Sequence, residues 1–319
     1  MATVTEIPLD ARDDGVRYQR PQSIWRLMLR RLLRERSAIV GMVILGILVF
    51  VAIAAPLVAP YEPNQDLIGV EDVDRRDGPC IHLLGCSEDR PQHLMGIDGN
   101  FRDVFSRVVY GTRVSLRIGF ITVGFAIIVG TVLGAISGYF GGWIGDVIMR
   151  VLDVILAFPF LLLAIAIVSV LGPGLTNAML AIAIVTTPQY ARVVRASVLS
   201  VREMDFVEAS RALGAGHASI LFGRILPNAL PPLIVQSTLG IATAILDTAA
   251  LSFIGLGAQP PTPEWGYMLA EERNQVFSAP HLVFFPGLAI MITVLAFNLL
   301  GDGLRDALDP RLAESGVKH

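Results

Sequence analysis

Residues 37–61 read SAIVGMVILGILVFVAIAAPLVAPY, and no charged side chain interrupts this stretch. A helix rises about 1.5 Å per residue, so roughly 20 apolar residues cross a hydrocarbon core about 30 Å thick. The stretch therefore predicts a transmembrane helix, which we place at residues 38–60. It is too long for the apolar part of a signal peptide and lacks a small-residue cleavage site, so we expect it to remain as an anchor.

Further apolar stretches follow with at most one charged residue in each: 118–145, 154–191, 230–256 and 277–301. Residues 154–191 are too long for one helix, and the sequence Gly-Pro-Gly at 172–174 divides them in two. Only 17% of the chain is charged, against roughly 25% in soluble domains. The sequence therefore predicts an all-α integral membrane protein with six transmembrane helices. Its net charge of -3 argues against a nucleic-acid partner.

Arginine placement predicts the orientation, because arginine and lysine collect on the cytoplasmic side. Residues 1–37 are rich in arginine and are expected in the cytoplasm, with 22–36 forming an amphipathic helix or a simple extension of the first span. Residues 61–112 hold ten acidic residues against five arginines and are expected outside. Four crossings return the arginine-rich loop at about 201–228 to the cytoplasm, and six return the tail at 311–319.

The outer segment contains both cysteines of the chain, Cys80 and Cys86. Facing an oxidising compartment, they form either a disulfide or two free thiols, and the sequence does not decide between these. His82 and His93 lie nearby but form no known ligand spacing with the cysteines, so we predict no metal site.

Residues 202–228 read REMDFVEASRALGAGHASILFGRILPN. Asp205 and Glu208 have the spacing of a capping box, which starts a helix. Gly214 and Gly216 would supply the left-handed positions that end it, and a second short helix would stop at Pro227. These features predict a helix-turn-helix tethered between two spans, with an ordinary loop as the alternative.

This segment resembles the loop known as EAA in the permease subunits of ABC importers. The resemblance rests on Glu208, Ala209, Ser210, Gly214, Ile225, Leu226 and Pro227. Residues 96–119 and 298–311 are similar to the dipeptide and oligopeptide permeases of the DppC/OppC type. Ile97 and Phe101 depart from the threonine and glycine usual there, which weakens any role for the turn that they form.

The resemblance implies a type I ABC importer permease with both termini cytoplasmic, whose shared transmembrane domain of five helices spans residues 113–310. It implies a multi-pass protein of the bacterial cytoplasmic membrane that imports di- or oligopeptides. Relatives of this kind also import glutathione or nickel complexes. The implied partners are membrane lipid, a second homologous permease, two ATP-binding subunits and an extracytoplasmic binding protein.

ATP and Mg²⁺ would bind to the partner subunits. The chain has no G-x-x-x-x-G-K-[ST] loop for ATP phosphates, so we predict that it is not an enzyme and carries no cofactor of its own. The resemblance implies that Glu208 contacts the ATPase and that Gly214 forms the turn. It also implies that Pro227 fixes the angle at which the chain enters the fifth span. Closure of the capping box is the alternative role for Glu208.

Polar residues of the fifth span predict a transport pathway. Gln236, Gly240, Thr243 and Asp247 recur at helical spacing on one face, and we expect Gln236, Thr243 and Asp247 to line the pathway, with Gly240 serving close packing. Thr186, Thr187 and Gln189 cluster near the end of span four. Trp143, Trp265 and Tyr267 are interpreted as anchors at the membrane interface.

Two other classes of function compete with this interpretation. A secondary transporter would carry inverted repeats and broken helices, and no clear repeat is visible in the sequence. A membrane-embedded enzyme would need a cluster of catalytic side chains within its spans, and His281 is the single histidine candidate there.

Overall fold

The computed structural model describes residues 32–308, so most of the expected amphipathic helix at 22–36 and the tail at 311–319 lie outside the described residues. Within this range the chain is helical and contains no strand. The long helices are α2 (Arg36–Val58), α3 (Val104–Phe140), α4 (Gly142–Leu156), α5 (Phe160–Leu171), α6 (Leu175–Arg202), α10 (Pro231–Phe253) and α12 (His281–Leu308). Shorter elements are η1 (His82–Leu84), α7 (Asp205–Ala212), α8 (His217–Ile220), η2 (Leu221–Ile225), α9 (Leu226–Ala229), α11 (Trp265–Glu272) and η3 (Arg273–Gln275).

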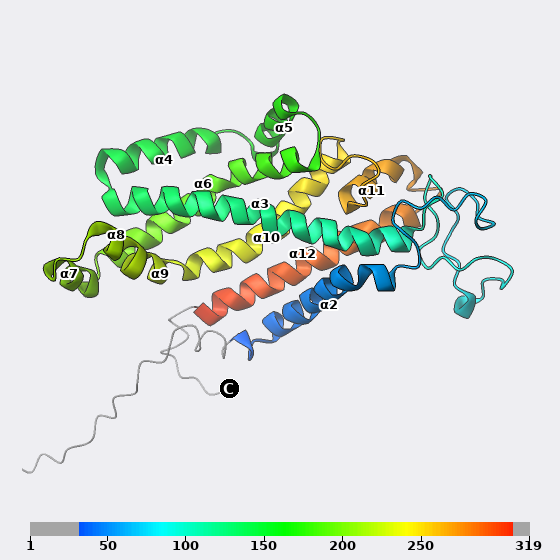
Figure 1. Ribbon diagram of the computed structural model, residues 1–319, viewed down its shortest axis with the longest axis horizontal. Coiled ribbons are helices and arrows are strands. Elements are labelled where there is room, and N and C mark those ends of the chain that lie inside the picture. The colour runs from blue at the N-terminus through cyan, green and yellow to red at the C-terminus, as the bar shows by residue number, and fades with distance from the viewer. Residues whose placement is uncertain (1–31, 309–319) are drawn as a thin grey trace, which may run out of the picture.

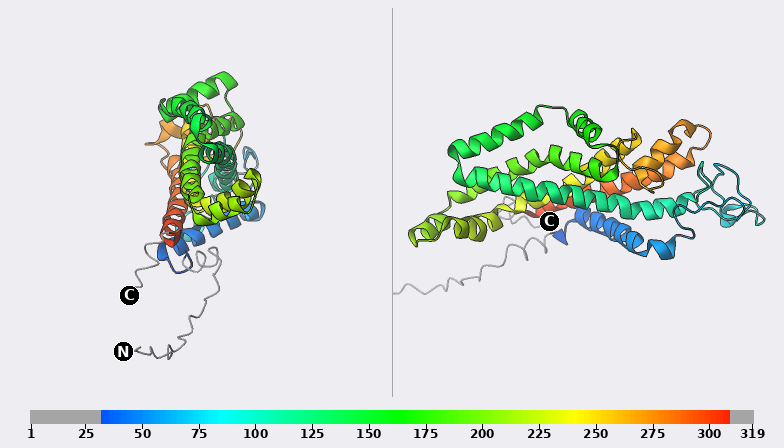
Figure 2. Two further views of the ribbon diagram at one scale, coloured as in Figure 1. Left: turned by 90° about the vertical axis from the view of Figure 1, so that its left-hand side faces the viewer. Right: turned by 45° about the horizontal axis from the view of Figure 1, so that its top comes forward.

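Apart from α5, the long helices run side by side in an elongated bundle, and its two ends are built differently (Figure 1). The segment that joins α2 to α3 gathers at one end, whereas α7 and α8 project at the other (Figures 1 and 2). The start of α2 meets the end of α12, where Leu32 and Ala38 pack against Leu304 and Ala307. The bundle therefore holds the two segments with predicted surface roles at opposite ends.

Among residues 32–308, four helices are long and apolar enough to cross a membrane: α2, α3, α10 and α12. The pair α4 and α5 forms a fifth candidate if a span bent by 90° is counted, and α6 is long but more polar. The predicted helix at 154–171 is wrong, because Pro159 precedes α5 and α4 has already ended at Leu156. The predicted helix at 118–145 is also wrong at its end, since Gly141 and Gly142 turn the chain at positive φ.

Small residues allow α3 to lie close against α6. A Cβ atom added at Gly130, Gly134 or Gly138 would press against α6, with Ala191 or Val198 among its neighbours. These glycines recur every four residues and share one face of α3, as in helix pairs that pack closely in membranes. The α3–α6 contact is thus the rigid centre from which the other helices are positioned.

Helix α3 begins at Val104, so residues 104–112 of the expected outer segment 61–112 are helical. Asp103 caps this helix by accepting a hydrogen bond from the backbone N–H of Ser106. Trp265 is not an interface anchor, as it is fully buried and its indole N–H donates to the carbonyl of Val108 at 3.0 Å. The absence of a side chain at Gly111 makes room for this indole.

Candidate coupling helices and polar face of the bundle

The predicted helix-turn-helix between the spans is present, with a start that differs from the capping-box prediction. Helix α7 begins at Asp205, but its N-cap is Met204, and no side chain caps it. Asp205 and Glu208 both lie in the first turn, where negative charge favours the helix dipole. The side chain of Glu208 is exposed, so it is open to contact from outside this chain.

Gly214 forms the turn between the two short helices. Its φ of +81° lies in the left-handed region, and its N–H donates to the carbonyl of Arg211. The same role predicted for Gly216 is wrong, because Gly216 has φ −70° and is the N-cap of α8. Ala209, one turn before Gly214, is exposed. The hydroxyl of Ser210 donates a hydrogen bond to the carbonyl of Phe206. A serine in the place of the second alanine therefore leaves the helix intact.

The second short helix does not stop at Pro227. Residues 221–225 form a π-turn, and the chain then continues through α9 into α10 with Pro227 inside α9. Proline lacks an N–H and crowds the carbonyl four residues earlier, a conflict that the wider π-turn relieves. Ile225 is buried in the core, Leu226 packs against the core, and Pro227 is exposed.

The helix pair is fixed firmly to the bundle. Val207 and Ile220 are buried in the main core. The hydroxyl of Tyr139, at the end of α3, lies 2.8 Å from Nδ1 of His217. Arg202 donates to the carbonyls of Gly138 and Tyr139 at 3.1 and 3.2 Å. The helix pair is therefore joined to the rest of the bundle by buried apolar side chains and by partly buried hydrogen bonds.

The outward face of the same helix pair is apolar at its tip. Leu213 is 88% exposed and Phe222 is 64% exposed, while Phe206 is also exposed. Exposed apolar side chains next to charged ones such as Glu208 are typical of a protein–protein contact. The tip therefore has the chemistry of an interface in addition to a rigid attachment.

On α10, the predicted pathway residues are placed unequally. Thr243 is exposed and donates to the carbonyl of Gly240, whereas Gln236 and Asp247 are half-buried. Among the described residues, the carboxylate of Asp247 has no hydrogen bond or ion pair. A side chain at Gly240 would overlap the hydroxyl of Tyr190, so Gly240 serves close packing against α6.

The threonines of α6 make the same kind of intrahelical hydrogen bond as Thr243 makes in α10. The hydroxyl of Thr186 donates to the carbonyl of Ile182, and Thr187 donates to that of Ala183. Both hydroxyls are therefore satisfied within their own helix.

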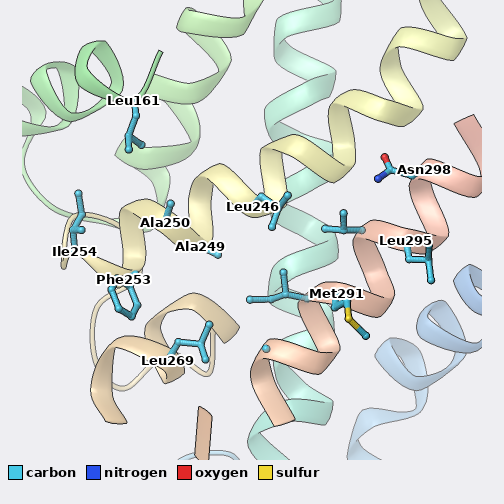
Figure 3. A pocket seen from close by; sticks show the side chains of 13 residues that line it. Leu161, Leu246, Ala249, Ala250, Phe253, Ile254, Leu269, Met291, Leu295 and Asn298 are labelled. Atoms are coloured by element: carbon cyan, nitrogen blue, oxygen red, sulfur yellow. The ribbon is translucent and has the colours of Figure 1, made fainter. Parts of the chain in front are cut away.

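A groove of about 750 Å³ opens between α5, α10, α11 and α12. Leu161, Leu246, Phe253 and Met291 line it, and Asn298 is its single amide side chain (Figure 3). Walls this apolar suit lipid tails or a second apolar surface, and they offer few partners for a peptide backbone.

At the outer end, Cys80 and Cys86 are joined by a disulfide, with Cα atoms 5.5 Å apart. It closes a short loop that contains η1. His82 lies 2.8 Å from the carbonyl of Arg90. Among residues 32–308 no group of histidine, cysteine, aspartate and glutamate is arranged to hold a metal ion.

A buried network centred on His93 ties this loop to α3. Its Nδ1 lies 3.0 Å from Asp103 and its Nε2 3.1 Å from Glu71, whose other oxygen accepts from the Tyr61 hydroxyl at 2.6 Å. Burial lowers the pKa of His93, but the hydrogen bonds and charges of Asp103 and Glu71 outweigh it and raise that pKa above 6.5. His93 therefore links Asp103 and Glu71 through its two ring nitrogens.

A second charged network joins the outer segment to α11, and sequence reasoning missed it. Arg102 pairs with Asp98 at 2.7 Å and with Glu271 at 2.8 Å, and Arg76 pairs with Glu272 at 2.8 Å. The available sequence signal for this network was the resemblance at residues 96–119, which includes Asp98 and Arg102. It gave no indication that their partner lies on α11.

The turn formed by Ile97 and Phe101 persists despite the unusual residues there. Phe101 adopts φ +57°, and its carbonyl accepts from the N–H of Leu67 at 3.0 Å. The left-handed conformation explains why glycine is usual at this position in the family that the motif resembles.

Comparison with known proteins agrees with this geometry. Residues 130–314 match the family described as binding-protein-dependent transport system inner membrane component. Residues 23–77 match the N-terminal transmembrane domain of oligopeptide transport permease C. The chain is 48% identical to the dipeptide transport permease DppC of Alkalihalophilus pseudofirmus, over 91% of each chain. It is 46% identical to the DppC of Haemophilus influenzae, over 88% of this chain and 92% of that one.

Other relatives carry a different substrate in their names. The glutathione transport permease GsiD of Pectobacterium atrosepticum is 42% identical, over 93% of this chain and 94% of that one. Among solved structures, the MetNI methionine ABC transporter in inward-facing conformations has a chain that aligns with a TM-score of 0.53 at 21% identity. That alignment covers 64% of this chain and 97% of the other, and at this identity it shows a shared fold alone.

Proposed function

The chain belongs to the family of binding-protein-dependent transport system inner membrane components, and we propose that it is the permease through which an ATP-driven importer moves short peptides. The observation that carries this proposal is the identity of 48% and 46% to two dipeptide permeases over about nine-tenths of the chain. The relative named for glutathione transport is less similar, at 42%, so nothing favours glutathione over a dipeptide. The family is a permease component and is not itself catalytic.

In this proposal six crossings are made by α2, α3, the bent pair α4 and α5, α6, α10 and α12. Helix α6 has 28 residues, and at 1.5 Å per residue it is about 42 Å long, enough to cross the bilayer. Among its polar residues, Arg192 pairs with Asp153 of α4 at 2.6 Å. The arginines of residues 1–37 and 201–228 support a cytoplasmic location for both termini and for the coupling helices, in a bacterial inner membrane.

The proposed partners occupy the two ends of the bundle. Two ATP-binding subunits, which hold ATP and Mg²⁺, would contact α7 and α8 of this chain and the equivalent helices of a second permease. Exposed Leu213, Phe222 and Glu208 supply the contact surface, and the buried attachments of Val207 and Ile220 supply the rigid-body transmission. An extracytoplasmic binding protein would deliver peptide at the end formed by residues 61–103.

Reconstitution tests the proposal. The chain is co-expressed with the second permease and two ATPase subunits encoded beside it, and the purified complex is placed in vesicles with its binding protein. ATP-dependent uptake of a labelled dipeptide, inhibited by excess dipeptide and not by glutathione, is expected. Uptake of glutathione with no uptake of dipeptide, or copurification with no ATPase, would contradict it.

Cysteine labelling of intact cells tests the topology. A cysteine placed at residue 74, in the outer segment, should react with an impermeant maleimide, whereas a cysteine at residue 213 should react only after the membrane is opened. Equal labelling of both positions from outside would overturn the proposed orientation.

A further inference from the structure

A second pocket, more polar than the groove of Figure 3, lies where α10 ends and α11 begins. It has a volume of about 350 Å³ and is lined in part by Gln259, Tyr267, Glu271 and Arg273. Sites for small ligands measure roughly 300–1,000 Å³, so a short peptide segment fits in it. Helix α11 lies toward the same end of the bundle as residues 61–103 (Figure 1).

The pocket presents one cation whose charge is not used within the described protein. Arg273 is exposed, makes no ion pair with residues 32–308, and has a single long contact, from Nη1 to the carbonyl of Ala270 at 3.4 Å. Glu271, by contrast, is already bound by Arg102 at 2.8 Å and by Asn100 at 2.7 Å. The charge that remains available in the pocket is therefore positive.

Gln259 and Tyr267 add directed polar atoms. The amide nitrogen of Gln259 donates to the carbonyls of Gly255 and Gly257 at 3.0 and 3.1 Å, which leaves its carbonyl oxygen as an acceptor. Burial, and after it the charge of Glu271, raises the pKa of Tyr267, and its hydroxyl donates to Glu271 only at 3.5 Å, so it can turn to a nearer acceptor. A guanidinium, an amide oxygen and a phenol thus line one pocket.

The pocket lies near the predicted pathway face of α10. Ile254 lines it and directly follows α10, at the i+7 position from Asp247 on the same face. At 1.5 Å per residue, the two positions are about 10 Å apart along the helix. A ligand leaving the pocket inward would therefore reach the face that carries Asp247 and Thr243.

We propose that this pocket receives the C-terminal end of a short peptide as it enters the permease. Arg273 binds the terminal carboxylate, the oxygen of Gln259 accepts the last peptide N–H, and Tyr267 donates to a carbonyl. The inference rests on the proposed function, since it names the part of the peptide that this site recognises. An arginine pairs well with carboxylates because its planar donors match their geometry.

The test uses the reconstituted complex and a dipeptide that carries a photoreactive diazirine side chain. In the complex without binding protein, we expect labelling within residues 252–273, and about tenfold less labelling by the same dipeptide with a C-terminal amide, as the loss of one charged hydrogen bond implies. Arg273→Gln should lower labelling and uptake by the same factor, and Arg273→Lys should restore part of both. Asn274→Ala, on the next residue and outside the pocket lining, should match the wild type.

The outcomes separate the pocket from the function. If the wild-type complex imports peptide and Arg273→Gln imports and labels equally well, the pocket proposal is overturned while the proposed function stands. If the wild-type complex imports no peptide, the function itself fails. An effect of Arg273→Gln seen only in vesicles with anionic lipid would assign the arginine to a lipid headgroup and overturn the proposal.

Discussion

The hydroxyl of Tyr139 lies 2.8 Å from Nδ1 of His217, which joins the last turn of α3 to the first residue of α8. The two rings also meet edge to face, with centroids 5.8 Å apart. Tyr139 is buried and the bond spans two elements 78 residues apart in the chain. In the proposed machine, this contact is one of the links through which movement of the coupling helices reaches a transmembrane helix.

Tyr139→Phe removes that hydrogen bond and keeps the buried ring. The net stability of one such bond is about 1 kcal/mol, so the protein should still insert and assemble. We expect the peptide imported per ATP hydrolysed to fall several-fold, because the link between α8 and α3 is looser. Ser169→Ala is the control, since it removes only a hydroxyl bonded within α5. An unchanged ratio in Tyr139→Phe would remove this contact from the coupling route.

Gly214 and Gly223 form a matched pair for the turn of the coupling helices. A Cβ atom has open space at both positions, but only Gly214 has positive φ. Gly214→Ala should therefore cost about 1 kcal/mol of local stability, whereas Gly223→Ala in a helical turn should cost nothing. We expect faster trypsin cleavage after Arg211 and reduced peptide uptake in Gly214→Ala alone. Equal behaviour of the two variants would show that the left-handed turn is unimportant.

The sequence was sufficient for the all-helical class and for the position of the two short helices α7 and α8. Long uncharged stretches and the Gly214 turn carry local signals, since each depends on residues next to one another. The break between α4 and α5 was missed because residues 154–171 lack charge on both sides of Pro159. Arg150 and Asp153 within α4 were the available warning that this helix is not a simple span.

The missed parts of the site depend on contacts between distant residues. Glu271 and Arg102 lie 169 residues apart, and no local spacing connects them. Burial of Trp265 against Gly111 is likewise a property of two helices packed together. The capping-box prediction was wrong by one position, because α7 starts one residue earlier than the pattern of Asp205 and Glu208 requires.

Close packing of α2 on α12 gives a prediction about α2. A Cβ atom at Gly41 would come within 2.8 Å of backbone atoms of Ala296 and Leu300. A Cβ atom at Gly46 would meet no neighbouring atom within 4 Å. Gly41→Leu should destabilise the complex by roughly 1–3 kcal/mol, the usual cost of overpacking. Gly46→Leu should leave it unchanged. Thermal unfolding in detergent compares the two, and equal melting temperatures would contradict the α2–α12 contact.

His93 predicts a pH dependence for the outer segment. Its pKa is raised in the folded protein, so the stabilisation is fully present below the unfolded pKa of 6.5 and is lost as pH rises through the folded value. The melting temperature of wild type minus that of His93→Gln should therefore be larger at pH 6 than at pH 8. Taking this difference cancels other titrating groups. A difference that does not change with pH would show that the imidazolium does not bridge Glu71 and Asp103.

Asp247 supports the last prediction, because its half-buried carboxylate on α10 pairs with nothing among the described residues. A charged carboxylate in the middle of a span costs roughly 2.5–3.5 kcal/mol on insertion scales, so such groups face water or a polar partner. Thr243 lies one turn away on the same face and is exposed. Asp247 therefore either lines the pathway, where it meets the ammonium end of a peptide, or bonds to the second permease.

Asp247→Asn separates these roles because it keeps the shape and hydrogen-bonding capacity and removes the charge. We expect peptide uptake to fall about tenfold while the complex assembles normally, since a pathway carboxylate acts through its charge on a cationic amine. Asp302→Asn, an exposed carboxylate at the end of α12, is the matched control and should import at the wild-type rate. Loss of assembly in Asp247→Asn would instead assign the carboxylate to the partner permease, and normal uptake with normal assembly would exclude both roles. Uptake and copurification of the second permease, measured on the same preparations, distinguish the three results.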